Sequence, residues 1–226
     1  MTFSILGRCP RSGEFGCALA TSSMAAGGRC HFVAPGFGAV LSQARSDPTL
    51  GALGLARLSA GRSASEALAD MIAATPHAAW RQLAVLDGAG RVADFTGAEV
   101  ASPKGSAAGQ GAVALGNAVA NDRVVGAILA GFAAAPEKPL AERLLMALEG
   151  GLDAGGELAP LRSAALRIAW PGVPFTPVDL RVDLSEAPIA ELRRYWTLWG
   201  PMADGYVKRA LAPDRAPSTE TIEGQR

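Results

Sequence analysis

The sequence opens with MTFSILGRCPRSGEFGCALATS, residues 1–22, in which two apolar runs flank a short polar segment. Residues 2–9 and 14–22 have the composition of β-strands, and the Pro-Arg-Ser-Gly segment at 10–13 provides turn chemistry between them. The pattern predicts a β-hairpin. The chain therefore enters its first sheet directly at Thr2.

Further strands and helices are predicted in alternating groups. Strands are expected at 37–44, 80–87, 91–96, 112–115, 162–170 and 178–182, with the Gly/Ser-rich stretch 102–111 as a link. A first helix is expected at about 50–61, and a second begins at Ser63, which forms a capping box with Glu66. A third helix begins after Asn121 as its N-cap, and a fourth has Pro139 in its first turn and ends at Gly150-Gly151. A last helix begins at Pro188. This order predicts an α/β (α+β) fold in which mainly antiparallel sheets are covered by helices. We expect a four-layer sandwich in one domain, residues 1–211, and a disordered polar tail at 212–226.

Composition excludes several classes of partner. Hydrophobic residues make up 49% and charged residues 19%, which suits a globular protein with a sizeable core. Lys+Arg and Asp+Glu are both 21, so the chain lacks the broad basic field on which nucleic-acid affinity depends. The longest apolar stretch, 124–135, is shorter than the ~20 residues that span a bilayer. We therefore expect neither a nucleic-acid nor a membrane partner.

The cysteines indicate a reducing compartment. Cys9, Cys17 and Cys30 are odd in number and show no CxxC spacing, which argues against a disulfide framework or a zinc site. Cys9 and Cys17 flank the first turn and could lie near each other, although small apolar strand residues are the preferred interpretation. Charged residues and a proline interrupt the first twenty positions, so no signal peptide is visible. The predicted location is the cytoplasm.

The familiar nucleophile motifs are absent. The sequence has neither a Gly-x-Ser-x-Gly elbow nor a Gly-x-x-x-x-Gly-Lys phosphate loop. His31 and His77 are candidate bases without a recognisable triad context, and a surface or satisfied core histidine is the preferred interpretation. Glu66 and Asp70 share one helix face, which we interpret as solvated.

Thr2 differs because it becomes the first residue if Met1 is removed. Its hydroxyl and a free α-amine would then lie on adjacent carbons. An unperturbed α-amine has a pKa of about 7.7–8.0, so part of it is neutral at cellular pH and can accept the hydroxyl proton. Such chemistry also requires the terminus to be held in a strand near donors for the developing oxyanion. Taken alone, a threonine at position 2 is a weak signal.

A series of short motifs strengthens this interpretation. They run in a consistent order over roughly residues 1–200: Met1-Thr2-Phe3-Ser4-Ile5, the 10–13 turn with Gly16, Ser42-Gln43-Ala44, Asp47-Pro48-x-x-Gly51, Arg81-Gln82-Leu83-Ala84, Thr96-Gly97, Gly116-Asn117, Leu140-Ala141-x-Arg143-Leu144-Leu145, Gly155-Gly156, Ser163-Ala164-Ala165, Leu180-Arg181-Val182-Asp183 and Pro188-Ile189-x-x-Leu192. With these motifs the chain resembles an uncharacterised bacterial family of Ntn-hydrolase-like proteins. The resemblance implies an αββα sandwich with an N-terminal threonine nucleophile. Members of the wider superfamily cleave amide bonds.

Within that resemblance, roles can be given to particular residues. Thr2 would be the catalytic nucleophile. Gly116 and Asn117 would supply a backbone N–H and a side-chain amide to an oxyanion hole, or Asn117 would only cap or turn the chain. Gln43 would orient the substrate, or would hydrogen-bond a buried loop.

Three further residues complete the candidate set. Arg81 would neutralise an acidic substrate, or would be an exposed strand arginine. Ser163 would line the cleft, although packing at a strand start is slightly favoured. Glu157 would contribute to substrate binding. It follows Gly155-Gly156 at a position where the family pattern has Asp. The residues from there to Arg162 also lack the family's Arg-Gly element. Leu115 stands where Gln is more usual. These departures predict a different substrate or a loss of turnover rather than a different fold.

The leading function is a hydrolase that acts on a C–N amide-type bond of a small molecule through an acyl-Thr2 intermediate. It would need neither a metal nor an organic cofactor, because one residue supplies both nucleophile and base. The alternative is a non-catalytic scaffold of the same fold that binds a small ligand or partner protein, which retention of Met1 would favour. The aromatic run Tyr195, Trp196, Trp199 and Tyr206 would pack in the core or support a homodimer.

Overall fold

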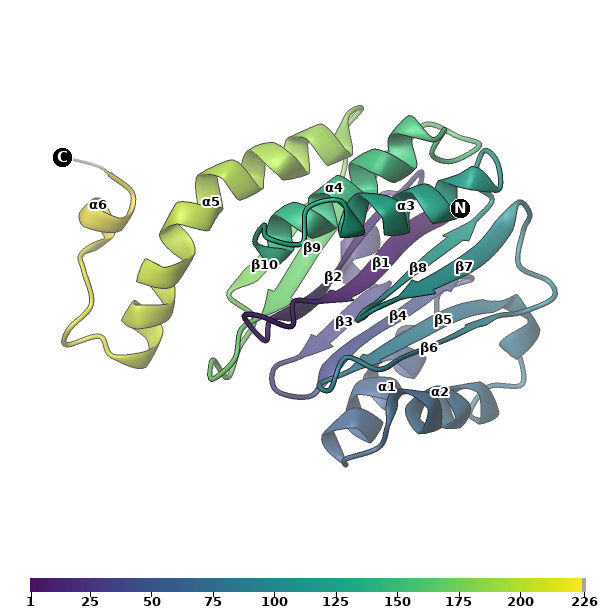
Figure 1. Ribbon diagram of the computed structural model, residues 1–226, viewed down its shortest axis with the longest axis horizontal. Helices are drawn as coiled ribbons and strands as arrows, with labels where there is room; N and C mark the ends of the chain where they lie inside the picture. The colour runs from purple at the N-terminus through teal and green to yellow at the C-terminus, as the bar shows by residue number, and fades with distance from the viewer. Residues whose placement is uncertain (225–226) are drawn as a thin grey trace.

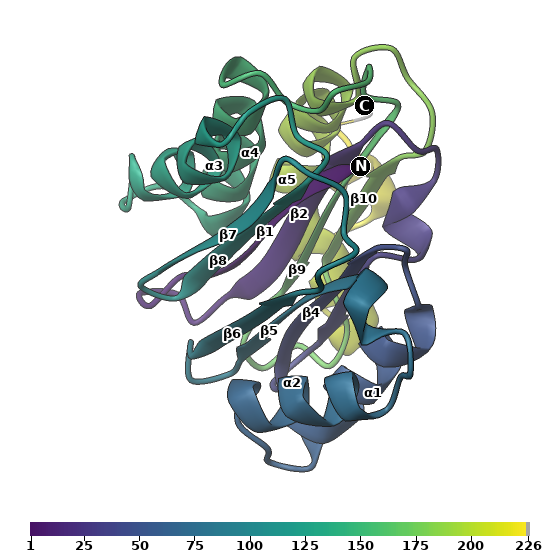
Figure 2. The same cartoon turned by 90° about the vertical axis from the view of Figure 1, so that its right-hand side faces the viewer.

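The computed structural model describes residues 1–224. Two β-sheets lie face to face, with helices covering both outer faces (Figures 1 and 2). The first sheet has six strands in the order β10-β9-β2-β1-β8-β7, and the second has four in the order β3-β4-β5-β6. Every strand pair in both sheets is antiparallel. The predicted four-layer αββα sandwich with mainly antiparallel sheets is therefore confirmed.

The elements have the following bounds. The first sheet contains β1 (Thr2–Arg8), β2 (Phe15–Thr21), β7 (Lys104–Gly109), β8 (Ala112–Asn117), β9 (Ser163–Ala169) and β10 (Val178–Val182). The second sheet contains β3 (His31–Ala34), β4 (Gly38–Ala44), β5 (Arg81–Asp87) and β6 (Val92–Thr96). The helices are α1 (Pro48–Ser59), α2 (Ala64–Ala73), α3 (Arg123–Ala133), α4 (Leu140–Asp153), α5 (Pro188–Leu211) and α6 (Thr219–Ile222), with short 3-10 turns η1 (Ala26–Gly28) and η2 (Ala78–Trp80).

Alternation along β1 decides which way its side chains point. Phe3 and Ile5 enter the apolar core beneath α3 and α4, whereas Leu6 enters the core between the two sheets. Successive strand side chains point to opposite faces, so Thr2 and Ser4 share the inter-sheet face with Leu6. A third core joins the second sheet to α1 and α2. The fold thus directs the first threonine inward, between the sheets.

Several local predictions are confirmed. The Ser63/Glu66 capping box is formed at the start of α2, and α5 begins at Pro188 as expected. The strands predicted at 80–87, 91–96 and 178–182 appear as β5, β6 and β10 with boundaries shifted by at most one residue. These segments were predictable because their signals are local.

Other predictions were wrong. Residues 102–111, expected to be a link, contain the edge strand β7, and β3 was not predicted at all. In β7 the small residues carry no apolar alternation, so backbone pairing with β8 decides the conformation.

The expected helix end at Gly150-Gly151 was also wrong, because α4 continues to Asp153. A Cβ at Gly150 would lie 2.9 Å from the carbonyl oxygen of Ala127, so this glycine permits the close crossing of α3 and α4. The helix starts differ by one residue from expectation. α3 has Asp122 at its N-cap, with the Asn121 side chain accepting a hydrogen bond from the Arg123 N–H, and Pro139 is the N-cap of α4.

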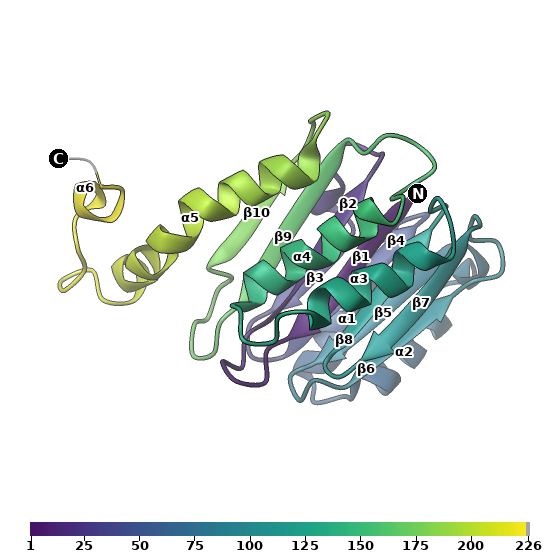
Figure 3. The ribbon, with the colours of Figure 1, turned by 45° about the horizontal axis from the view of Figure 1, so that its top comes forward.

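The C-terminal helix extends beyond the sandwich. Its first half packs on β9 and β10, and its second half projects past the sheet edge (Figure 3). Tyr195, Trp196 and Trp199 pack against the apolar core, and Trp199 stacks on Tyr206. The tail 212–226 was expected to be disordered, but its described part, 212–224, includes the short helix α6; residues 225–226 lie outside the described part of the chain. Within residues 1–224, no helix is both long and apolar enough to cross a bilayer.

Candidate active site

Thr2 lies at the inter-sheet start of β1 and is only 5% exposed. Its Oγ1 is hydrogen-bonded to the carbonyl of Met1 and lies 3.4 Å from the Oγ1 of Thr21. The Thr21 hydroxyl itself donates to the Met1 carbonyl over 2.7 Å. Two threonine hydroxyls therefore converge on the peptide bond that joins Met1 to Thr2.

A buried chain of side-chain hydrogen bonds leads from this position across to the second sheet. The Ser4 hydroxyl donates to Gln43 Oε1 over 2.6 Å, and Gln43 Nε2 donates to Gln82 Oε1 over 2.8 Å. Asn117 Nδ2 donates to the same Gln82 oxygen over 3.0 Å. All four side chains are at most 1% exposed. The network fixes the orientation of Asn117 beside Thr2.

Gln82 is the centre of this network, although its sequence position alone did not single it out. Its Nε2 lies within hydrogen-bond distance of three acceptors, namely the Thr96 hydroxyl and the carbonyls of Gly105 and Gly116, at 3.0–3.1 Å. The available signal was a polar residue in the apolar strand 81–87. Because burying an unpaired amide is costly, such a residue must be satisfied by tertiary contacts.

Gly116 is placed differently from Asn117. It pairs with Phe3 in the middle of the sheet, so it faces α3, and a Cβ there would lie 2.7 Å from Val125 Cγ2. The structure therefore brings Asn117 to Thr2, but it uses Gly116 to pack α3 against β8. The backbone N–H of Gly116, expected in an oxyanion hole, lies between the two flanking strands β1 and β7.

Glu157 approaches the N-terminus from the loop after α4. Gly155 and Gly156 have positive φ values of 125° and 64°, and this backbone turns Glu157 toward the site. Its Oε2 accepts a hydrogen bond from the Ser22 N–H over 2.9 Å, while its Oε1 is buried without a partner. Burial raises the pKa of the Glu157 carboxyl, against the opposing effects of Ser22, Thr21 and the N-terminal amine. A desolvated carboxyl with one unpaired oxygen thus lies near the chain terminus.

Ser163 and Arg81 have structural partners. The Ser163 hydroxyl donates to the Ser23 carbonyl over 2.7 Å and accepts from the Ala26 N–H, which holds the loop after β2. Arg81 donates to the Arg45 carbonyl, and its guanidinium lies 3.6 Å from the Asp47 carboxylate. Arg81 therefore stabilises the turn between β4 and α1.

A small cavity of about 210 Å³ opens beside the terminus. It is lined by Met1, Ala44, Arg45, Trp80, Glu99, Val100, Ala101 and Asn117. The Arg45 guanidinium lies 4.2 Å from the centre of the Trp80 ring. Sequence reasoning missed Arg45, Trp80 and Glu99, because nothing local indicates that η2 and the loop after β6 meet the N-terminus.

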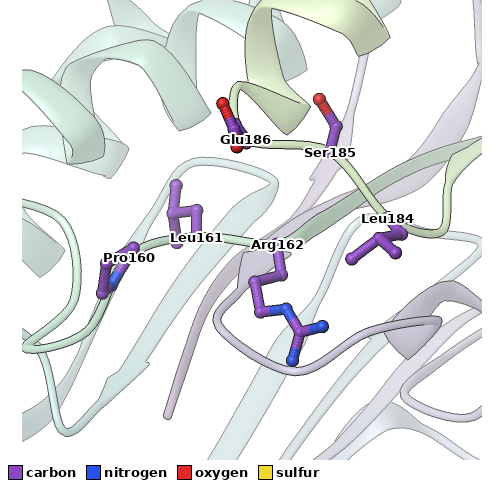
Figure 4. A pocket seen from close by; sticks show the side chains of 6 residues that line it. All are labelled: Pro160, Leu161, Arg162, Leu184, Ser185 and Glu186. Atoms are coloured by element: carbon purple, nitrogen blue, oxygen red, sulfur yellow. The ribbon is translucent and has the colours of Figure 1, made fainter.

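A larger hollow of about 610 Å³ lies between the 160–162 segment and residues 184–186 (Figure 4). Its side chains are those of Pro160, Leu161, Arg162, Leu184, Ser185 and Glu186. None of them belongs to the Thr2 cluster, by which we mean the side chains of Thr2, Thr21, Ser4, Gln43, Gln82 and Asn117. Its greater size is therefore no reason to prefer it over the cavity at Met1 and Asn117.

The remaining candidates lie outside the cluster. His31 is buried, both of its ring nitrogens lack a partner, and burial together with Arg167 and Arg181 lowers its pKa to about 3. His77 is exposed, and Glu66 and Asp70 pair with surface arginines. Within the described part of the chain, no three His, Cys, Asp or Glu side chains are grouped to hold a metal ion.

Comparison with known proteins gives a family and a structural relative. Residues 2–192 match DUF1028, a family of unknown function. A crystal structure of protein SPO2555 from Silicibacter pomeroyi, described as DUF1028, is 33% identical with a TM-score of 0.81, covering 87% of this chain and 84% of that one. Anbu, the ancestral beta-subunit from Yersinia bercovieri, has a TM-score of 0.43 and 11% identity over 96% of this chain and 98% of that one. No curated protein matched the chain.

Proposed function

The chain belongs to DUF1028, and we propose that it is an N-terminal-nucleophile hydrolase that cleaves a C–N amide bond of a small molecule through Thr2. The observation that carries the proposal is the position of Thr2. Its hydroxyl lies on the inter-sheet face, among buried polar side chains, next to a cavity lined by Met1 and Asn117. Removal of Met1 would widen that cavity and place the α-amine of Thr2 at its wall.

The proposed reaction needs only groups of this chain and water. The α-amine accepts the hydroxyl proton while Thr2 Oγ bonds to the amide carbon, and the carbonyl electron pair moves onto oxygen. Collapse of this intermediate breaks the C–N bond, and the leaving amine takes the proton from the α-ammonium. Water then attacks the acyl-Thr2 ester, transfers a proton through the α-amine to Thr2 Oγ, and releases the carboxylic acid.

Asn117 is the proposed oxyanion donor. An amide Nδ2 carries two hydrogens, and the network assigns one of them to Gln82 Oε1. The second hydrogen is the one that we propose for the oxyanion, because Asn117 also lines the cavity. Because Gln82 fixes the amide plane, this donor is oriented before the substrate binds, as electrostatic stabilisation of an oxyanion requires.

Glu157 is the proposed partner of the α-amine. The Oε1 of Glu157 is buried without a partner. The N-terminal amine lowers the pKa of this carboxyl, against the larger effect of burial, which raises it. After Met1 is removed, that oxygen could accept a hydrogen bond from the Thr2 ammonium. This would be a positioning role, in place of the substrate contact expected from the sequence. The three free thiols suit the cytoplasm, where we propose the protein works.

One observation favours the non-catalytic alternative. With Met1 present, its carbonyl accepts hydrogen bonds from both Thr2 and Thr21, so the two hydroxyls are already satisfied. A chain that keeps Met1 would then be a stable scaffold whose cavity binds a ligand without turnover.

The deciding experiment is the intact mass of untagged protein before and after incubation with an electrophile that traps N-terminal threonine. We expect loss of Met1 and one adduct, which Thr2→Ala abolishes. Thr197→Ala, at an exposed threonine of α5, is the matched control and should label normally. Complete retention of Met1 without an adduct would overturn the hydrolase and favour the scaffold.

A further inference from the structure

Two unpaired charges of opposite sign line the cavity beside Thr2. Neither Arg45 nor Glu99 forms an ion pair within residues 1–224, and both side chains are exposed. The neighbouring cation Arg81 is held by Asp47, so Arg45 is the guanidinium left at this cavity. An arginine and a glutamate that share one small cavity without pairing with each other are each available to a ligand.

Trp80 prepares Arg45 for this role. Its ring lies 4.2 Å from the guanidinium carbon, a distance at which a cation is attracted to the ring face. Stacking limits the orientations of the guanidinium without using its N–H donors. Those donors can therefore bind a carboxylate in the bidentate manner that arginine favours.

We propose that this cavity binds the zwitterionic head of an amino-acid-like ligand, with the carboxylate on Arg45 and the ammonium on Glu99. With Met1 in place the cavity measures about 210 Å³, which is room for a small molecule, so one compact head group can meet both charges. The amide end of the ligand then points toward Asn117 and Thr2. The substrate class that follows is the side-chain amide of a free amino acid. This assignment to a substrate rests on the proposed hydrolase, whereas binding of the head group does not.

The test uses the full chain carrying Thr2→Ala, so that binding is measured without turnover. L-Glutamine and L-asparagine are the zwitterionic probes, because each carries an ammonium, a carboxylate and a primary amide on a small skeleton. Glutaramate lacks the ammonium, and 4-aminobutanamide lacks the carboxylate. Calorimetric titration should show that one zwitterion binds about tenfold more tightly than either singly charged analogue, as expected for charge-assisted hydrogen bonds.

Two substitutions on this background identify the contacts. Arg45→Gln should remove the preference for ligands with a carboxylate, and Glu99→Gln should remove the preference for those with an ammonium. Both side chains are exposed, so these variants should fold normally. Arg62→Gln, at an exposed arginine before α2, is the control and should bind like its parent. Equal affinity for all probes, or no effect of either substitution, would overturn the proposal.

The outcomes separate this inference from the proposed hydrolase. Adduct formation on Thr2 without zwitterion binding would overturn the cavity assignment and leave the nucleophile in place. Zwitterion binding that depends on Arg45 and Glu99, in a protein that retains Met1 and forms no adduct, would support the cavity assignment and overturn the hydrolase.

Discussion

Thr2 and Asn117 occupy the same register position of the antiparallel β1–β8 pair, so their side chains emerge side by side on the inter-sheet face. Directly opposed strand residues have Cβ atoms about 4.5–5.5 Å apart. The proposed nucleophile and the proposed oxyanion donor are therefore held side by side by backbone pairing.

Substitution of Asn117 tests that pairing. Asn117→Ala should lower the rate of amide hydrolysis, or of acylation by an activated ester, by about 10²–10³, the usual effect of losing one oxyanion donor. The α-amine and the hydroxyl of Thr2 remain, so labelling by an alkylating electrophile, which develops no oxyanion, should change little. Equal losses in both reactions would show that Asn117 only supports the structure.

Gln82 should dominate the stability of the site. In Gln82→Leu, the side-chain amides of Asn117 and Gln43 and the carbonyl of Gly116 each lose their hydrogen bond to Gln82. These groups are buried between the sheets, where water does not replace the lost bonds. Buried unpaired groups cost about 1–3 kcal/mol each, so we expect roughly 2–4 kcal/mol lower unfolding free energy after relaxation. Chemical denaturation measures it. The control is Gln110→Leu, at the exposed β7–β8 turn, which should change stability by less than about 0.5 kcal/mol.

The sequence predicts those parts of the site that depend on neighbouring residues, and it misses those that depend on residues far apart in the chain. Thr2 was identifiable because its chemistry follows from its place in the chain, and the hairpins and capping box follow from neighbouring residues. Arg45, Glu99 and Gln82 join the site only when β4, β5 and the loop after β6 pack against the first sheet. No local periodicity encodes that contact, just as none encodes pairing of β7 with β8.

The pH dependence of stability should expose Glu157. Burial raises its folded-state pKa above the unfolded value, so the ionised carboxylate is disfavoured in the folded protein. The resulting loss of stability is absent at low pH and grows as pH rises through the unfolded pKa, about 4.3. In protein that retains Met1, chemical denaturation should therefore show Glu157→Gln to be more stable than wild type at pH 7, and by a smaller margin at pH 4.

The same variant reports on function. If Glu157 positions the α-amine, Glu157→Gln should slow adduct formation on Thr2 and shift its pH profile, while Met1 is still removed. A stability gain at pH 7 together with an unchanged labelling profile would leave Glu157 without a role at the terminus.

His31 should produce the opposite pH dependence. Its pKa falls from 6.5 to about 3 in the folded state, because burial and two arginines disfavour the imidazolium. Its contribution to stability is complete above pH 6.5 and is lost as pH falls toward 3, by roughly 3–5 kcal/mol in the limit. His31→Leu should reduce acid denaturation in that window. His77→Leu, at an exposed position, should follow wild type.

The crossing of α3 and α4 gives a test of packing in which both variants lie on one helix. A Cβ at Gly131 would lie 2.5 Å from the carbonyl oxygen of Met146, a backbone atom that can yield only if the helices separate. Gly131→Ala should therefore destabilise the protein by about 1–3 kcal/mol. At Gly126, on the same helix, an added Cβ meets nothing within 4 Å, so Gly126→Ala should stabilise by about 0.5–1 kcal/mol through helix propensity alone. Opposite signs in thermal denaturation would confirm that close approach of the helices, rather than flexibility, requires glycine at 131. The same sign for both would contradict it.

Since α3 also packs on β8 through Val125 and Gly116, the Gly131 variant should in addition weaken Thr2 labelling by disturbing the strand that carries Asn117.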